Sequence, residues 1–349
     1  MTTTDDAARI RISGPAGLLA AVPPLLGFHP TNSLVLLCVW GGRRRVGPVA
    51  RVDLPPGHDL TLASQLTLYA RLHADEVAVV CYLRGTRRPP ILDDLLGELT
   101  RAGVRVMDAM IVRDGWARPA LTAAMERDHP GIPMPGPDDP VVRALHAAGA
   151  LSGRSVLPDR AALRRSIAGP TGTKLQAAEA AISEAAAGRL PVSTDSGCGR
   201  VVTLRRTRQV GAQRVRQSLW RLMDLACHQV ADSGAVELEV ATAVAVVLAE
   251  DSVRDAVLAE ALRELDGSWL PMLIACATWT PDAVAPPLCS VLAAVAYRHG
   301  DGALAQVAVD RCLAAEPGNP LALLLIDVMS AGLHPERLDG IVALGSRNR

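Results

Sequence analysis

The first third of the chain alternates between short apolar runs and segments with the periodicity of amphipathic helices. Val, Leu and Ile dominate the short runs, and turn residues separate them from the helical segments. This alternation is typical of an α/β layer in which helices cover a sheet. We expect strands at residues 9–13, 33–40, 46–53, 76–83 and 104–112, and helices at 16–21, 61–74 and 90–102.

The segment that introduces the second strand reads VPPLLGFHPTNSLVLLCVWGG over residues 22–42. Its part LVLLCVW is apolar at every position, which predicts a strand that is covered on both faces. The Pro23-Pro24 pair should end the preceding helix, because proline disrupts a helix interior. Phe28 is the only Phe in the chain, and we expect it to fill a place in the core.

A turn-capable GGRRR segment at 41–45 joins this strand to the next, so we expect an antiparallel hairpin. Symmetric pairing about Arg43 places Ser33 opposite Asp53, although a register shifted by two residues also fits the pattern. Pro48 indicates that the second strand of the hairpin lies at a sheet edge or begins irregularly. Helical connections then return strands 76–83 and 104–112 parallel to strand 46–53.

This topology gathers polar side chains at one end of the sheet. The loop before strand 33–40 meets the carboxyl ends of the three parallel strands there, and ligands favour that edge in open α/β sheets. Imidazoles, carboxylates and guanidiniums suit acid/base chemistry or the binding of a small anionic ligand. The candidate ligand-binding residues are His29, Asn32, Asp53, His58, Arg84, Arg113 and Asp114, with Arg84 and Arg113 as the anion-binding pair.

A purely structural interpretation of these residues stands beside the functional one, and we favour it. Asn32 and Ser33 are ordinary turn residues, Pro30 keeps His29 extended, and Gly27 suits a helix end. We assign no catalytic residue, because no nucleophile with its base and no glycine-rich phosphate motif is legible. We also predict no cofactor and no metal site, since no two cysteines have Cys-x-x-Cys spacing.

The rest of the chain changes character at a proline-rich segment, residues 125–140, and again at 191–200. Beyond the second break the pattern is almost entirely helical, and near the end two helices flank an EPGNP turn with tetratricopeptide-like spacing. We therefore expect an α/β amino-terminal domain with a mixed sheet (1–124) and a proline-rich linker with connecting helices (125–200). An all-α carboxyl-terminal domain (201–349) of helical hairpins resembling tetratricopeptide repeats follows.

Two stretches carry a family resemblance. The run LLAAVPPLLGFHPTNSLVLLCV, followed by ARVDLPP at 50–56, and the ending DGALAQVAVDRCLAAEPGNPLALLLIDVMSAGLHPE resemble the actinobacterial domain-of-unknown-function family 4192. The resemblance covers most of the chain and implies no activity. Many relatives carry a cysteine-rich segment where this chain has DGWARPALTAAMERDHPGIPMP, so a metal or redox role suggested by relatives does not extend to it.

Charge narrows the classes of partner. The formal net charge is zero, with 36 basic and 36 acidic side chains, so no overall field attracts nucleic acid. Residues 200–223 contain seven Arg and no acid, and Arg206, Arg214 and Arg221 mark a surface for nucleic acid or an acidic partner. Nine acids against two Arg at 232–266 can neutralise this surface, so we do not expect nucleic-acid binding.

Location and function follow from the same patterns. The polar amino terminus lacks a secretory signal, and no apolar stretch reaches the roughly 18 residues of a membrane span. We expect a cytoplasmic protein without membrane contact. We favour a protein-interaction or scaffold protein that binds a protein partner or self-associates. The alternatives are an enzyme or ligand sensor at the sheet end and a nucleic-acid-associated factor.

Overall fold

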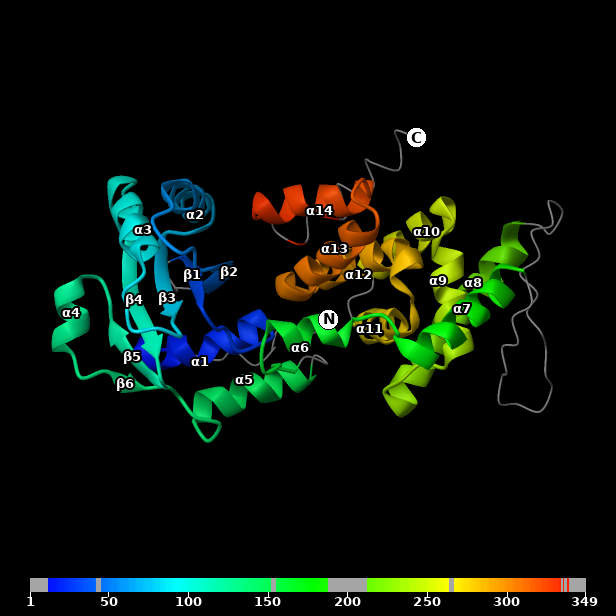
Figure 1. Cartoon of the computed structure of the whole chain (residues 1–349), viewed down its shortest axis with the longest axis horizontal. Helices are drawn as coiled ribbons and strands as arrows, with labels where there is room; N and C mark the ends of the chain where they lie inside the picture. The colour runs from blue at the N-terminus through cyan, green and yellow to red at the C-terminus, as the bar shows by residue number, and fades with distance from the viewer. Residues whose placement is uncertain are drawn as a thin grey trace, which may run out of the picture. The chain divides into compact units, whose positions relative to one another are not determined.

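The computed structural model describes residues 12–41, 45–151, 155–187, 212–263 and 267–333, together with Pro335 and Leu338. The chain divides into two compact units, Met1–Arg160 and Ala161–Arg349. The first unit contains a six-stranded mixed sheet with helices, and the second is helical (Figure 1). Both parts of the predicted fold class are thus confirmed, whereas the likeness to tetratricopeptide repeats stays a prediction.

The sheet has the order β2-β1-β3-β4-β5-β6, in which only β3 and β4 are parallel neighbours. Its strands are β1 (Ser33–Trp40), β2 (Arg45–Asp53), β3 (Glu76–Tyr82), β4 (Arg105–Arg113), β5 (Trp116–Pro119) and β6 (Ile132–Pro133). The helices of this unit are α1 (Gly14–Leu26), α2 (Leu60–His73), α3 (Pro90–Arg101), α4 (Ala123–Asp128) and α5 (Pro140–Leu151).

The hairpin predicted around Arg43 is confirmed in its register. Ser33 lies opposite Asp53, and the pairing continues without a shift as far as Leu37 and Val49. β2 is the edge strand that Pro48 indicated, and β1 is buried at every residue except Trp40. β3 runs parallel to β2, as predicted, although β1 lies between them.

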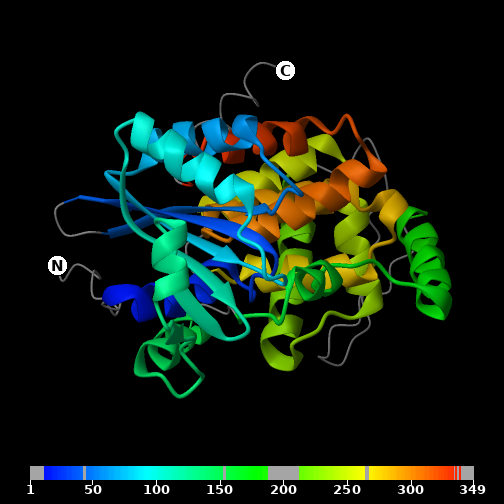
Figure 2. The same cartoon turned by 60° about the vertical axis from the view of Figure 1, so that its left-hand side comes forward.

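Alternation along the strands gives the sheet two covered faces. Leu34, Leu36 and Ile111 belong to one core cluster with residues of α2 and α3. Val35 and Leu37 are fully buried and point to the other face. Figure 2 shows α2 and α3 on one side of the sheet and α1 on the other, and α5 packs against α1.

The prediction that Pro23 and Pro24 end the first helix is wrong. α1 includes both prolines and ends at Gly27, whose φ of 73° is left-handed. Each proline lacks the N–H that would bond one turn back, but the helix buries most of its residues, Val22 and Pro23 among them. Burial of this apolar segment outweighs the missing hydrogen bonds.

Other elements also differ from the sequence pattern. Ile12 and Ser13, the described part of the predicted strand 9–13, are not in a strand, and Ser13 is the N-cap of α1. The proline-rich segment 125–140 contains β6, so the sheet extends beyond residue 124. α4 and β5 were missed as well, because elements this short carry little periodicity.

The described part of the second unit is helical. Its helices are α6 (Arg160–Ser166), which begins at the last residue of the first unit, then α7 (Gly172–Ala186), α8 (Ala212–Ser233), α9 (Leu238–Leu248), α10 (Asp251–Arg263), α11 (Trp269–Trp279), α12 (Pro286–Arg298), α13 (Gly302–Ala315) and α14 (Pro320–Ser330), with a 3-10 turn at Asp282–Val284. α13 and α14 flank the EPGNP turn, as predicted.

The guanidinium of one arginine forms hydrogen bonds that connect several of these helices. Arg311 on α13 is 11% exposed and donates to the carbonyl oxygens of Ala277 and Thr280, at 2.9 and 2.6 Å. It also forms an ion pair with Asp282 at 2.9 Å. The side chain therefore adds hydrogen bonds to carbonyl groups at the end of α11, where the regular bonding pattern of the helix stops.

Candidate functional site

The topology brings the predicted site residues to one end of the sheet. Ser33 lies opposite Asp53 in β2 and opposite Tyr82 in β3, and Tyr82 lies beside Val112 in β4. The start of β1 therefore meets the ends of β2, β3 and β4. Asn32, Arg84 and Arg113 occupy the same end of the sheet, as the sequence predicted.

A buried polar cluster forms on the α1 face of this end. Ser33 is fully buried, and its Oγ accepts from Nε and Nη2 of Arg51 at 3.0 and 2.6 Å. Nη2 of Arg51 also donates to Asp53 at 2.6 Å, and the guanidinium lies 5.9 Å from the ring centroid of Phe28. Phe28 is 2% exposed, so it fills the core as predicted. The cluster is internally satisfied.

Arg113 belongs to a different cluster on the opposite face. It follows Ile111 by two residues, and Ile111 packs in the core with α2 and α3. Asp53 lies at the same register position as Ser33 and Tyr82. Its side chain therefore points to the α1 face, opposite to that of Arg113. The sheet therefore separates Asp53 from Arg113, although both lie at the same end.

The cluster around Arg113 is a network of ion pairs. Glu126 of α4 lies 3.1 Å from Arg88 and 3.4 Å from Arg113, and Arg88 also pairs with Asp93 at 2.7 Å. Arg88 and Glu126 are each 12% exposed. Burial would lower the pKa of Arg88, but hydrogen bonds and charge from Asp93 and Glu126 outweigh it, and the pKa is raised. The network fastens α4 to the start of α3.

The remaining candidates lie apart from both clusters. His58 is 74% exposed and contacts Asp94 on α3 at 2.9 Å. Arg84 and Asp114 are exposed, and neither forms a hydrogen bond or an ion pair among the described residues. Asn32 and Asp114 have φ values of 47° and 50°, which is uncommon for residues other than glycine.

His29 lies beside α5 at the edge of this group. Its backbone N–H donates to the Leu157 carbonyl at 3.0 Å. The residue is exposed overall, but partial desolvation lowers the pKa of its imidazole, and the nearby charge of His146 lowers it further.

Several residues that hold these clusters together were not predicted. Arg51, Arg88 and Glu126 occur in segments that carry many arginines and acids, and nothing in their spacing marks them out. Arg51 could still have been identified from the sequence. Residues i and i+2 of a strand share a face of the sheet, and Asp53 was already a candidate site residue.

The described residues contain no group of three or more His, Cys, Asp or Glu side chains arranged to hold a metal ion. In the same part of the chain, no helix combines the length and apolar character required of a membrane span. Of the predicted basic surface, Arg206 lies outside the described residues, Arg214 lies in α8, and Arg221 on α8 is exposed.

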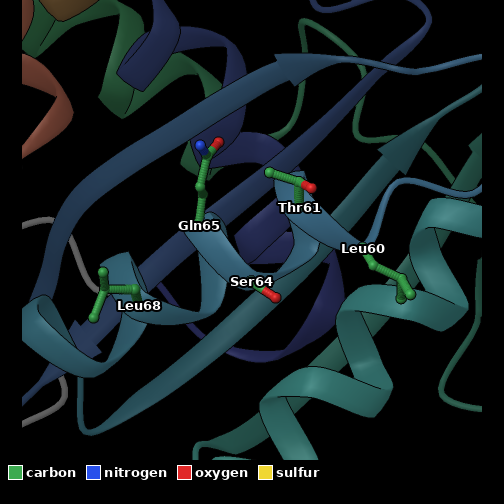
Figure 3. Close-up of a pocket in the computed structure, with 5 residues that line it drawn as sticks. All are labelled: Leu60, Thr61, Ser64, Gln65 and Leu68. Carbon is green, nitrogen blue, oxygen red and sulfur yellow. The ribbon is translucent and has the colours of Figure 1, made fainter.

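A different surface was not anticipated, the outer face of α2. Its exposed residues are Leu60, Thr61, Ser64, Gln65, Leu68, Arg71 and Leu72. Figure 3 shows the side chains of five of them, Leu60, Thr61, Ser64, Gln65 and Leu68. They line a shallow, open surface region of about 450 Å³. All five come from this one helix, so the region is the exposed surface of α2 and not a cleft between elements.

Comparison with known proteins gives one informative result. No curated protein and no solved structure matches the chain. A family model described as a domain of unknown function, DUF4192, matches residues 15–336. The match includes every strand of the sheet and both clusters at its end. This chain therefore belongs to the DUF4192 family.

Proposed function

We propose that this chain is a protein-interaction protein of an actinobacterial cytoplasm and that the outer face of α2 binds its partner. The observation that supports this proposal is the exposure of three leucines on that face. Leu60, Leu68 and Leu72 are 58%, 56% and 64% exposed. Leucines gathered on one exposed helix face are typical of a binding surface.

The local sequence explains why these leucines are not needed in the core. Ala63, Leu66 and Ala70 already supply the buried stripe of α2, at the spacing that faces the sheet. The leucines of the outer face lie on the other side of the helix and contribute nothing to that core. Burying each of them on binding would contribute about 1.5–3 kcal/mol before ordering costs.

The shape and charge of the face favour an amphipathic helix as the partner. From Leu60 to Leu72 the face extends for about 18 Å, since an α-helix rises about 1.5 Å per residue. Arg71, near the carboxyl end of α2, is its only charged residue. A partner helix with an apolar stripe and one acidic residue near Arg71 would complement it.

The test places a photo-crosslinking amino acid at Gln65 and illuminates the protein in its host. We expect a discrete adduct with another protein, cross-linked through a helical segment, and its loss when Leu68→Glu is added. The matched control is Leu323→Glu, the same change at a leucine of α14 that is 44% exposed. An adduct that survives Leu68→Glu, or one that contains only copies of this chain, contradicts the proposal.

A second candidate function is the binding of a small anion at the sheet end. It is supported by the exposure of Arg84, which forms no ion pair among the described residues. Arg113 would contribute less than we expected, because Glu126 already engages it. Titration with inorganic phosphate, followed by thermal unfolding, tests this: a stabilisation that Arg84→Ala abolishes supports it, and no stabilisation rules it out.

A further inference from the structure

Helices α8 and α11 carry closely similar short sequences. They read WRLMDLAC at 220–227 and WLPMLIAC at 269–276, so each helix has Trp, Met, Ala and Cys at the same spacing. Residues three, four and seven positions apart on a helix share one face. The Trp, the Met and the Cys of each segment therefore lie on the same face of their helix.

Two contacts show that α8 and α11, which pack against each other, run in the same direction. The rings of Trp220 and Trp269 meet edge to face, with their centroids 6.3 Å apart. Beyond the carboxyl end of α8, the carbonyl oxygen of Val236 accepts from Nε1 of Trp279, the last residue of α11, at 3.0 Å. The contacts follow the same order along both helices. About two turns beyond the tryptophans, each helix therefore brings its cysteine to the same level.

The two cysteines at this level are Cys227 and Cys276. Cys276 is fully buried, whereas Cys227 is partly exposed. Burial raises the pKa of the Cys276 thiol, and the nearby charge of Cys227 raises it further. Such an effect requires the two sulfur atoms to be close. The contacts of the tryptophans and the electrostatics of the thiols thus agree that the cysteines face each other across the helix interface.

A thioether lies one turn before each thiol. Met223 is 1% exposed and Met272 is fully buried. Within α11, Sδ of Met272 lies 3.8 Å from Sγ of Cys276, and the same spacing along the sequence recurs in α8. The interface therefore holds two thiols and two thioethers. We call these residues the sulfur group: Met223, Cys227, Met272 and Cys276.

We propose that the sulfur group binds one copper(I) ion between α8 and α11, with the two cysteine sulfurs as the main ligands. Thiolate and thioether sulfurs are soft donors and favour copper(I). Zinc sites use thiolate, imidazole and carboxylate ligands, so the two methionines favour copper(I) over zinc. The ion would enter at the partly exposed Cys227, and its binding would release the two thiol protons to solvent. This inference is independent of partner binding by the outer face of α2.

Competition for copper(I) with a chromogenic chelator tests the site in the reduced, full-length protein. We expect one ion bound per chain. Cys227→Ser and Cys276→Ser should each bind it at least about tenfold more weakly, since loss of even a supporting partner of a ligand costs that much. Cys289→Ser is the matched control, because Cys289 is also a fully buried thiol with a second thiol nearby, that of Cys312. Circular dichroism monitors folding. No bound copper(I), or an equal loss in the control, overturns the proposal.

X-ray absorption at the copper edge identifies the ligands independently of affinity. The spectrum should contain a shell of sulfur neighbours and no shell of nitrogen or oxygen. Met272→Leu nearly conserves volume and removes one thioether, so it should weaken binding several-fold while both thiols remain. If nitrogen or oxygen neighbours appear, or if Met272→Leu binds copper(I) as tightly as the unchanged chain, the proposal is wrong.

Discussion

At the scale of single residues, close contacts determine which substitutions the fold tolerates. Gly169 shows this most clearly, because a methyl group there would lie 2.6 Å from Nη2 of Arg311 and 2.9 Å from the carbonyl oxygen of Thr280. Arg311 cannot move aside without giving up the carbonyls that it satisfies at the end of α11.

We expect Gly169→Ala to lower the free energy of unfolding by about 1–3 kcal/mol, the usual cost of overpacking a tight site. Gly302→Ala is the control, since a methyl group there meets nothing within 4 Å and its φ is not positive. Urea unfolding of both variants measures the difference. Equal stability of the two would show that Arg311 is not held as tightly as its contacts indicate.

His29 should make stability depend on pH. Its pKa is lowered in the folded protein by burial and by His146, so the unfolded chain binds the proton more tightly. The free energy of unfolding should therefore fall as pH falls below about 6.5, the ordinary value for histidine. His29→Gln should reduce this slope in denaturant unfolding between pH 5 and 8, and an unchanged slope would contradict the assignment.

At the scale of elements, ion pairs fasten short segments that have little core of their own. α4 has no buried residue, and Glu126 joins it to Arg88 and Arg113. Removing that carboxylate leaves two largely buried guanidiniums with fewer partners. Loss of a partner by a buried charge lowers the free energy of unfolding.

Glu126→Gln should lower the free energy of unfolding by about 1–3 kcal/mol at neutral pH. Glu179→Gln on the exposed side of α7 is a matched control and should change it by less than about 0.5 kcal/mol. Chemical denaturation compares the two. If both variants match the unchanged protein, the network contributes nothing measurable to stability.

The sequence predicted the longer elements well because burial on both faces leaves a clear signal. The run LVLLCVW became β1, and pairing Ser33 with Asp53 followed from the symmetry of one hairpin. The path of α1 through Pro23 and Pro24 was not predictable, since it depends on burial by distant segments. The separation of Asp53 from Arg113 could have been anticipated from strand alternation, whereas the partners Arg88 and Glu126 required the tertiary structure.

At the scale of the whole molecule, the chain has two compact units, each with its own apolar core. Differential scanning calorimetry should therefore resolve two transitions. Glu126→Gln should lower the temperature of one of them, and Gly169→Ala should lower the other, because the substitutions lie in different units. A single transition that both substitutions shift equally would mean that the units unfold together.

The central claim is that the outer face of α2 is covered by a partner in the host, and labelling of Ser64→Cys tests it most directly. Among the described natural thiols, Cys38, Cys81, Cys276, Cys289 and Cys312 are buried, which lowers their background reaction. Maleimide should modify residue 64 several-fold more slowly in native extract than in the purified protein, while Glu179→Cys should react equally in both. Equal rates at residue 64 would contradict the claim.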